Sequence, residues 1–92
     1  MPILGFKHKG LNQLFDSRAS KLIRADIRKK CLRALDYIDV IVDPSDCQGF
    51  MAFHPLIGNR KGYFALNISA NYRMTFRWID DGVYDVDLED YH

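Results

Sequence analysis

Cysteines, long hydrophobic runs and metal-ligand motifs are all scarce in this chain of 92 residues. Cys31 and Cys47 show neither a CxxC motif nor metal-type spacing, so we expect no metal site, and no disulfide is implied. No apolar run approaches the roughly 20 residues of a membrane span, and the apolar stretch before Lys7 is too short for a signal peptide. The sequence therefore predicts a cytoplasmic protein without a cofactor, in which Cys31 packs in the core and Cys47 lies in a polar loop.

An excess of one charge is also missing, because thirteen Lys/Arg against twelve Asp/Glu leave a net charge of +1. The distribution is uneven. Residues 1–42 hold nine Lys/Arg and four Asp, whereas residues 43–92 hold four Lys/Arg and eight acids. The balanced charge and ordinary apolar content exclude a disordered chain, and the length leaves room for one domain. The basic first half indicates an anionic or acidic partner, and charge alone does not distinguish this from a solvated helix face.

The last forty residues carry the clearest structural signal. Apolar and polar residues alternate along 61–69, 72–79 and 83–92, which is the pattern of half-buried strands. A three-residue loop at 80–82 keeps the apolar side chains on one face, whereas a two-residue loop at 81–82 turns them to the wrong face.

The loop residues and the pairing follow from this choice. Gly82 is expected in the left-handed conformation that closes such loops. The same parity argument assigns residues 69–71 to the first hairpin, with Asn71 left-handed. The predicted opposite pairs are Trp78–Tyr84, Phe76–Val86, Met74–Leu88, Arg77–Asp85 and Arg73–Glu89.

Two segments before the sheet have helical periodicity. We predict a first helix over Leu11 to Arg18 and a second over roughly Arg24 to Val42, with a short edge strand at Ile3 to Lys7 preceding both. The order β-α-α-β-β-β predicts one α+β domain over residues 1–92, with a largely antiparallel sheet and two helices packed on one face. The apolar stripe of the second helix comprises Ile27, Cys31, Ala34, Leu35, Ile38, Ile41 and Val42.

Four sequence blocks together resemble a known family: HKGLNQLF (8–15), FHPLIGNRKGYF (53–64), NYRMTFRW (71–78) and EDYH (89–92). In this order and spacing they resemble the HigB toxins, within the RelE/ParE-like superfamily of toxin–antitoxin systems. The resemblance implies a small RelE-like fold and a ribosome-dependent mRNA endonuclease, which cleaves in the A site of the small (30S) ribosomal subunit and inhibits translation. The implied partners are a HigA-type helix-turn-helix antitoxin, the ribosome with its mRNA, and operator DNA bound through the antitoxin complex.

The same resemblance implies the site. Its catalytic residues fall on His54, Asp90, Tyr91 and His92, with Arg73 as a supporting cation. The family often has Lys after its HPL block, where this chain has Ile57. The candidate RNA- and phosphate-binding residues are then Arg60, Lys61 and Arg77, of which Arg60 or Lys61 has to replace the missing cation.

These residue types suit attack of the RNA 2′-OH on the adjacent phosphate. The reaction needs a base for the 2′-OH, positive charge for the phosphorane and an acid for the 5′-oxygen. His54 and His92 are candidates for the two proton transfers, because histidine titrates near neutral pH. Asp90 would orient a histidine or raise its pKa, and Tyr91 would stack on a base or donate to the phosphate.

Each residue also has an ordinary structural explanation. A lone His before Pro is commonly a loop residue, a terminal His92 is commonly frayed, and Arg73 can pair with Glu89 across the strands. Strand parity adds a conflict, because Asp90 and His92 share the apolar parity of their strand, whereas Arg73 has the polar parity of its own. A bulge near Glu89, or an approach around the sheet edge, would bring Asp90 and His92 to the site.

Two other function classes remain open. ParE-like relatives share the fold but act on DNA gyrase without a nuclease site, and His54 together with the terminal DYH favours the nuclease. A DNA-binding module would use the basic first turn of the second helix, but no helix-turn-helix pattern is visible. That turn comprises Arg28, Lys29, Lys30 and Arg33.

Overall fold

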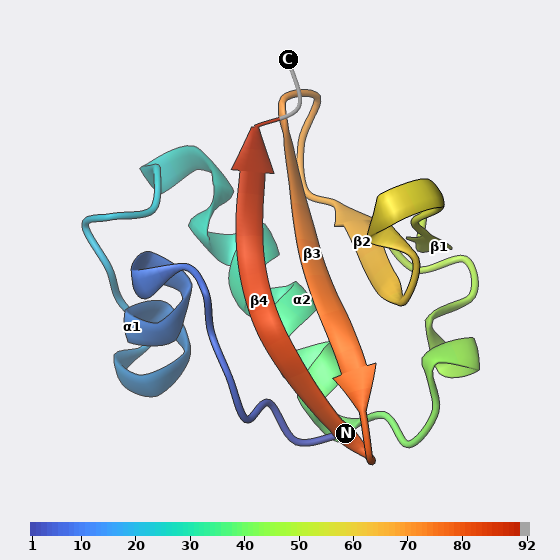
Figure 1. The fold of residues 1–92 in the computed structure, drawn as a ribbon. Coiled ribbons are helices and arrows are strands. Elements are labelled where there is room, and N and C mark those ends of the chain that lie inside the picture. Colours follow the sequence, from blue (N-terminus) through green and yellow to red (C-terminus); the bar gives the residue numbers. More distant parts are fainter. Residues whose placement is uncertain (91–92) are drawn as a thin grey trace.

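A four-stranded antiparallel sheet forms the centre of the computed structural model, which describes residues 1–90 (Figure 1). Its strands follow the chain in the order β1-β2-β3-β4. The strands are β1 (His54–Pro55), β2 (Tyr63–Asn67), β3 (Tyr72–Ile79) and β4 (Gly82–Asp90). The predicted N-terminal edge strand is reduced to two parallel bridges to β4, Ile3–Val83 and Phe6–Val86.

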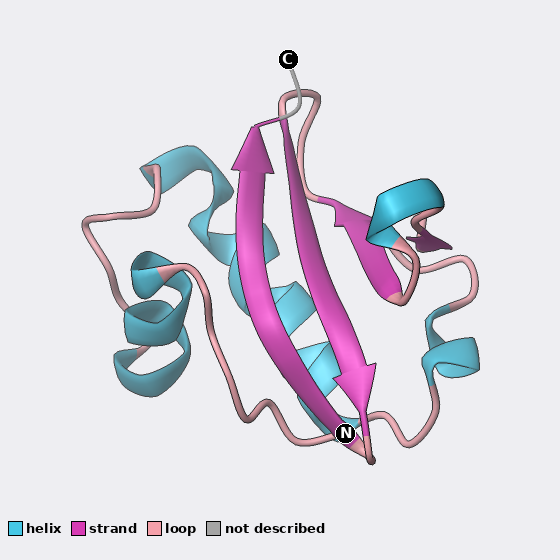
Figure 2. Ribbon diagram, in the orientation of Figure 1, coloured by secondary structure: helices cyan, strands magenta, loops and turns pink. Residues whose placement is uncertain are grey.

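Two α-helices, α1 (Lys9–Ser17) and α2 (Arg28–Val40), accompany the sheet. In Figure 1, α2 crosses behind β3 and β4, and α1 lies beside β4. His8 caps α1, because its Nδ1 accepts a hydrogen bond from the Leu11 N–H at 3.2 Å. Three short 3₁₀ helices occupy the connections (Figure 2): Ala25–Ile27, Pro44–Cys47 and Gly58–Arg60. The predicted α+β fold and both helices are confirmed, with boundaries shifted by one to four residues.

The apolar sides of both helices and of the sheet meet in one core. The stripe predicted for the second helix is buried from Ile27 to Ile41, and the inclusion of Val42 is wrong. Val42 is 80% exposed, because α2 ends at Val40 and the backbone turns extended at Ile41. The expectation for Cys31 is confirmed, whereas Cys47, predicted in a polar loop, is buried at the end of the 3₁₀ helix Pro44–Cys47. Both thiols are free, and burial raises the pKa of Cys31 to about 12 and that of Cys47 to about 11.

The connection between β3 and β4 differs from the predicted three-residue loop. Ile79 pairs with Gly82, so only Asp80 and Asp81 form the loop, and both have positive φ (48° and 66°). Two left-handed residues are the conformation of a type I′ hairpin turn. Gly82 does not have positive φ. Its missing side chain instead leaves room for Leu4, whose Cδ1 would lie 2.7 Å from a Cβ at this position.

A β-bulge compensates for the shorter loop. Between the pairs Arg77–Tyr84 and Thr75–Asp87, β4 has two residues where β3 has one, and Asp85 in the bulge has a φ of 56°. The extra residue restores the predicted register beyond it. The predicted pairs Met74–Leu88 and Arg73–Glu89 are therefore confirmed, whereas Trp78 faces Val83, Arg77 faces Tyr84, and Phe76 faces the bulge.

The hairpin between β2 and β3 has the predicted register. Asn67 pairs with Arg73, and Ile68 and Ser69 both donate their N–H to the Tyr72 carbonyl. Asn71 does not have positive φ, so its predicted left-handed conformation is wrong. The Ser69 hydroxyl closes this turn instead, because it accepts hydrogen bonds from the Asn71 and Tyr72 N–H groups. None of the helices within residues 1–90 is both long and apolar enough to cross a membrane.

Candidate active site

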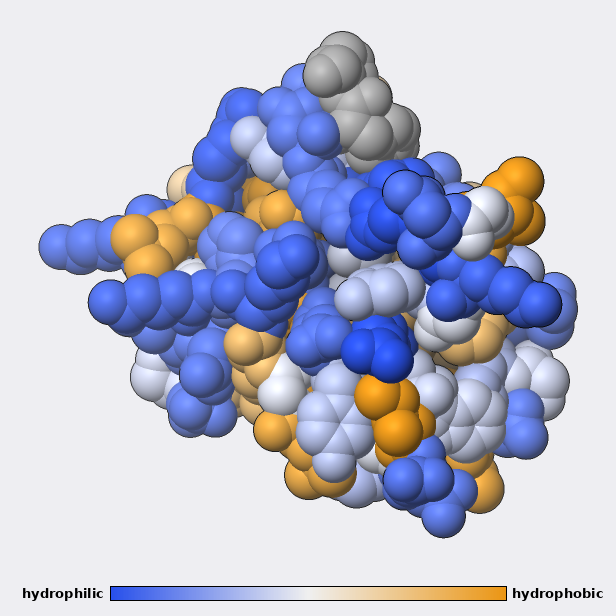
Figure 3. Space-filling model, in the orientation of Figure 1, coloured by the Kyte–Doolittle hydropathy of each residue, from blue (hydrophilic) through white to orange (hydrophobic). Residues whose placement is uncertain are grey.

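The face of the sheet opposite α2 is polar. Side chains alternate along each strand, so Arg73, Thr75 and Arg77 of β3 point away from the core that buries Met74 and Phe76. Opposite residues share a face, which adds Asp87 and Glu89 of β4 and Tyr63 of β2. The hydropathy view of this side of the molecule is largely hydrophilic over its centre (Figure 3).

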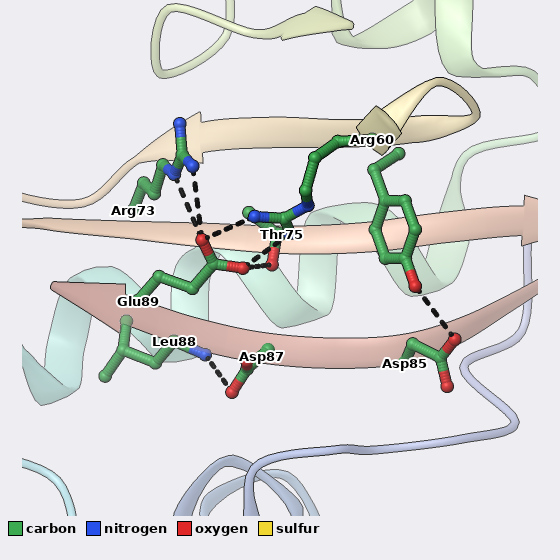
Figure 4. Close-up of polar contacts among 8 residues, drawn as sticks. Arg60, Arg73, Thr75, Asp85, Asp87, Leu88 and Glu89 are labelled. Carbon is green, nitrogen blue, oxygen red and sulfur yellow. Dashed lines mark hydrogen bonds and ion pairs between the residues drawn. The ribbon is translucent and has the colours of Figure 1, made fainter. Parts of the chain in front are cut away.

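Glu89 is the centre of this polar face (Figure 4). Arg60 donates from Nη1 and Nη2 to its two carboxylate oxygens at 3.1 and 2.7 Å. Arg73 donates to Oε1 from Nη2 at 3.2 Å and from Nε at 3.4 Å, and the Thr75 hydroxyl donates to Oε2 at 2.8 Å. Three side chains from β3 and from the 3₁₀ turn Gly58–Arg60 therefore converge on one carboxylate of β4.

The charges of this cluster stabilise one another. The hydrogen bond from Arg60 is the main reason that the pKa of Glu89 falls from 4.5 to about 2, and the Thr75 hydroxyl and Arg73 lower it further. Desolvation acts in the opposite direction, because the Glu89 side chain is only 22% exposed. The same hydrogen bond raises the pKa of Arg60. Glu89 is therefore ionised throughout the range in which proteins work.

A second ion pair lies farther along the same face. Arg77 donates to Asp85 at 3.3 Å, and the Tyr63 hydroxyl approaches the same carboxylate at 3.5 Å. The guanidinium groups of Arg60 and Arg77 lie 5.0 and 5.5 Å from the centre of the Tyr63 ring. A hollow of about 330 Å³ lies here, and its lining comprises Lys7, Asn59, Arg60, Tyr63, Thr75, Asp85, Asp87 and Glu89. It has the size and the polar lining for a small polar group, and its charged side chains are two cations and three carboxylates.

His54 lies at the opposite edge of the sheet, on β1. It pairs with Ala65, which pairs with Thr75, so its side chain is on the polar face. His54 is exposed, and its Nδ1 lies 2.9 Å from the Ala52 carbonyl oxygen. A carbonyl oxygen only accepts, so Nδ1 carries the proton in this contact and Nε2 of the neutral ring keeps a lone pair. The turn that sets this geometry has positive φ at Met51 (47°) and Ala52 (53°).

The structure brings some of the predicted site residues together and keeps others apart. Arg60 and Arg73 meet at Glu89, whereas Lys61 is exposed and Arg77 belongs to the Asp85 pair. Strand spacing places the Cα of His54 roughly 12 Å from that of Arg73 and roughly 17 Å from that of Asp90. An RNA strand is long enough to contact all three.

Asp90 has the strand parity opposite to that of Arg73 and Glu89, so the conflict predicted from the sequence persists in the structure. It pairs with Tyr72, next to the regular pair Arg73–Glu89, and the bulge of β4 is at Asp85. The bulge considered near Glu89 is therefore absent from β4, which the structure describes as far as Asp90. The predicted site residues Tyr91 and His92 lie outside the described residues. No group of three or more His, Cys, Asp or Glu within residues 1–90 is arranged as metal ligands.

Sequence reasoning missed two members of the cluster as site residues. Thr75 is fully buried on the polar face, and Glu89 was assigned only to a pair with Arg73. A threonine between two arginines on one strand face was a usable signal for Thr75. The contact between Arg60 and Glu89 joins residues 29 positions apart through an irregular loop, so no periodicity indicated it.

Comparisons with known proteins agree with this architecture. A family model described as "RelE-like toxin of type II toxin-antitoxin system HigB" matches residues 4–92. The chain is 34% identical over 91 residues to "Endoribonuclease HigB" of Proteus vulgaris, and this alignment covers 98% of this chain and 99% of the relative. It is 32% identical over 80 residues to "Toxin HigB-1" of Vibrio cholerae serotype O1, and this alignment covers 84% of this chain and 84% of the relative.

Proposed function

The chain belongs to the HigB family of RelE-like toxins of type II toxin–antitoxin systems, and on this premise we propose that it is an endoribonuclease. It cleaves mRNA in the ribosomal A site and thereby inhibits translation. The observation that carries the proposal is the match, over nearly the full length of both chains, to a relative named as an endoribonuclease. The open polar face with its two arginines supports it, because a phosphate needs such donors.

The proposed reaction is attack of the 2′-OH on the adjacent phosphate. A base takes the 2′-OH proton, the 2′-oxygen bonds to phosphorus, and the P–O bond to the 5′-oxygen breaks as an acid protonates that oxygen. The products are a 2′,3′-cyclic phosphate and a 5′-OH. His54 and His92 serve the two proton transfers. The lone pair on Nε2 of His54 supports the role of base or, once protonated, of acid.

The remaining residues act on charge and orientation. Arg73, together with Arg60, stabilises the negative phosphorane through charge-assisted hydrogen bonds. Asp90 orients a histidine, and Tyr91 stacks on a base or donates to the phosphate. Because His54, Arg73 and Asp90 are spread over the sheet, the ribosome is expected to position the mRNA across them.

Membership of a type II toxin family implies an antitoxin partner. We propose that this partner is of the HigA type, with a helix-turn-helix domain, and that operator DNA is bound through the toxin–antitoxin complex.

The test uses purified toxin, programmed ribosomes and matched free mRNA. We expect rapid cleavage in the A-site codon on ribosomes, slow cleavage of free mRNA, and no effect of a chelator under conditions that keep ribosomes intact. A 2′-deoxy nucleotide on the 5′ side of the scissile phosphate should abolish cleavage, because it removes the nucleophile. Cleavage that survives this substitution would refute the proposed reaction.

A matched pair of histidine variants tests the site. His54→Ala should slow single-turnover cleavage by about 10²–10⁴-fold, the range for loss of a general acid or base. His8→Asn is the control, because Asn keeps the cap of α1. Equal rates for the two variants would remove His54 from the mechanism. Inhibition of DNA gyrase by the wild-type toxin, without RNA cleavage, would instead favour the ParE-like function.

A further inference from the structure

Two guanidinium groups and one hydroxyl converge on the Glu89 carboxylate. These are also the donors that bind a phosphate group, since arginine forms paired hydrogen bonds with both carboxylates and phosphates. The side chains of Arg60, Arg73 and Glu89 together carry one net positive charge. Asp85 and Asp87 also line the adjoining hollow, and Asp85 is paired with Arg77, so a phosphate is attracted to the two guanidinium groups rather than to the hollow as a whole.

We propose that Glu89 is a positioning residue that holds Arg60 toward the scissile phosphate. This inference rests on the proposed nuclease function and assigns its phosphate-binding residue. It selects Arg60 over Lys61, which the sequence alone left as equal candidates.

The contacts of Arg60 favour this choice. Its guanidinium lies 5.0 Å from the centre of the Tyr63 ring and donates two of its five N–H groups to Glu89. It therefore lies across the sheet from the 3₁₀ turn to β4, with its group at the hollow described above. Ile57, at the start of the same turn, is 85% exposed and brings no charge. Lys61 is an exposed, flexible point charge at the end of the turn.

Pre-ordering explains why a carboxylate belongs in a phosphate site. A free arginine side chain populates many rotamers. If binding has to fix one of them, the side-chain entropy that is lost reduces the net stabilisation of the transition state. The hydrogen bonds to Glu89 fix Arg60 during folding instead. Glu89 occupies one edge of the guanidinium, and the three remaining N–H groups of Arg60 donate to no side chain or backbone group within residues 1–90.

Single-turnover cleavage on programmed ribosomes, at saturating toxin, tests the roles. Arg60→Ala should slow cleavage by about 10²-fold, the size of losing one transition-state donor, with little change in ribosome affinity. Lys61→Ala should lose much less, and Glu89→Gln should lose about tenfold. The double variant should be clearly faster than the product of the two single losses predicts, because Glu89 acts through Arg60. Asp36→Asn, which breaks the exposed ion pair with Arg18 and touches no site residue, is the control and should leave the rate unchanged.

A binding measurement separates this inference from the nuclease function. The probe is a 2′-O-methyl trinucleotide, which cannot be cleaved, and the readout is the Nε–Hε NMR signals of the arginines. The Arg60 signal should shift during titration of the wild-type protein and shift much less in Glu89→Gln. Glu89→Asp, which keeps the charge on a shorter side chain, gives an intermediate result if the fold is retained. Circular dichroism checks the fold of each variant.

The outcomes are distinct. Ribosomal cleavage that proceeds equally well without Arg60 or Glu89 overturns this inference and leaves the nuclease function standing. Absence of cleavage by the wild type, together with a Glu89-dependent Arg60 shift, refutes the nuclease and retains the phosphate site. Independent, multiplicative losses for Arg60→Ala and Glu89→Gln also overturn the positioning role.

Discussion

Replacing Glu89 by Gln changes the charge of the polar cluster while nearly keeping its shape. The fall in the pKa of Glu89 from 4.5 to about 2 corresponds to about 3 kcal/mol, at about 1.4 kcal/mol for each pH unit. Because the pKa in the folded state is lowered, this stabilisation is fully present above the unfolded pKa near 4.5 and is lost as the pH falls toward 2. Glu89→Gln lacks this electrostatic stabilisation at every pH.

Urea unfolding followed by circular dichroism measures the difference. The wild type should exceed Glu89→Gln in free energy of unfolding by about 2–3 kcal/mol at pH 7. That difference should shrink as the pH falls through the interval between 4.5 and about 2. The Thr75 hydroxyl can still donate to the Gln oxygen, so the variant keeps one of the contacts. Asp85→Asn is the matched control and should lose only about 0–1 kcal/mol, because both members of its ion pair are more than 40% exposed.

Two results would refute this reasoning. A difference between wild type and Glu89→Gln that stays constant from pH 7 to pH 2.5 would mean that packing, not ionisation, stabilises the cluster. A loss at pH 7 no larger than that of Asp85→Asn would mean that Arg60, Arg73 and Thr75 do not hold the carboxylate.

Three further predictions concern the site and the hairpin. Arg73→Ala should slow single-turnover cleavage on ribosomes by about 10²–10³-fold with little change in ribosome affinity, whereas Arg77→Ala should lose only a few-fold. A rate for Arg73→Ala within a few-fold of wild type would reduce Arg73 to a partner of Glu89. Removal of Tyr91 and His92 should abolish growth arrest on induction while the circular dichroism spectrum is retained, and a folded, fully toxic truncation would contradict the site. Asp81→Gly should raise the free energy of unfolding in urea by roughly 0.5–1 kcal/mol, because glycine adopts the positive φ of this turn without strain, and a destabilised variant would contradict the type I′ assignment.

Alternation of apolar and polar residues was sufficient to predict β2, β3 and β4, but not β1, whose two residues are too few for a periodic pattern. Period-two patterns fix which face each strand buries, and the pair Arg73–Glu89 followed from that rule together with the placement of the hairpin loop at residues 80–82. The helices followed in the same way from their apolar stripe. The sequence blocks also identified the family, and the comparison over residues 4–92 confirms that identification.

The turn and the bulge were not predictable separately. A three-residue loop without a bulge and a two-residue loop with one bulged residue give the same register at Met74 and Arg73. Parity alone cannot distinguish them. Packing distinguishes them, because Gly82 must pass close to Leu4 of the N-terminal segment, which pairs with β4 only in the folded chain.

The sequence by itself thus determined the strands β2 to β4, both helices, the family and the place of Arg73 on β3. Only the tertiary structure decided that Arg60 reaches Glu89, because an irregular turn has no period from which a direction can be inferred. The position of that guanidinium depends on its stacking over the Tyr63 ring. It also depends on β2 and β3, which bring Arg60 and Glu89 into contact although they are 29 positions apart in the sequence. Local patterns determine which face a residue lies on, and long-range packing determines which side chains on that face meet.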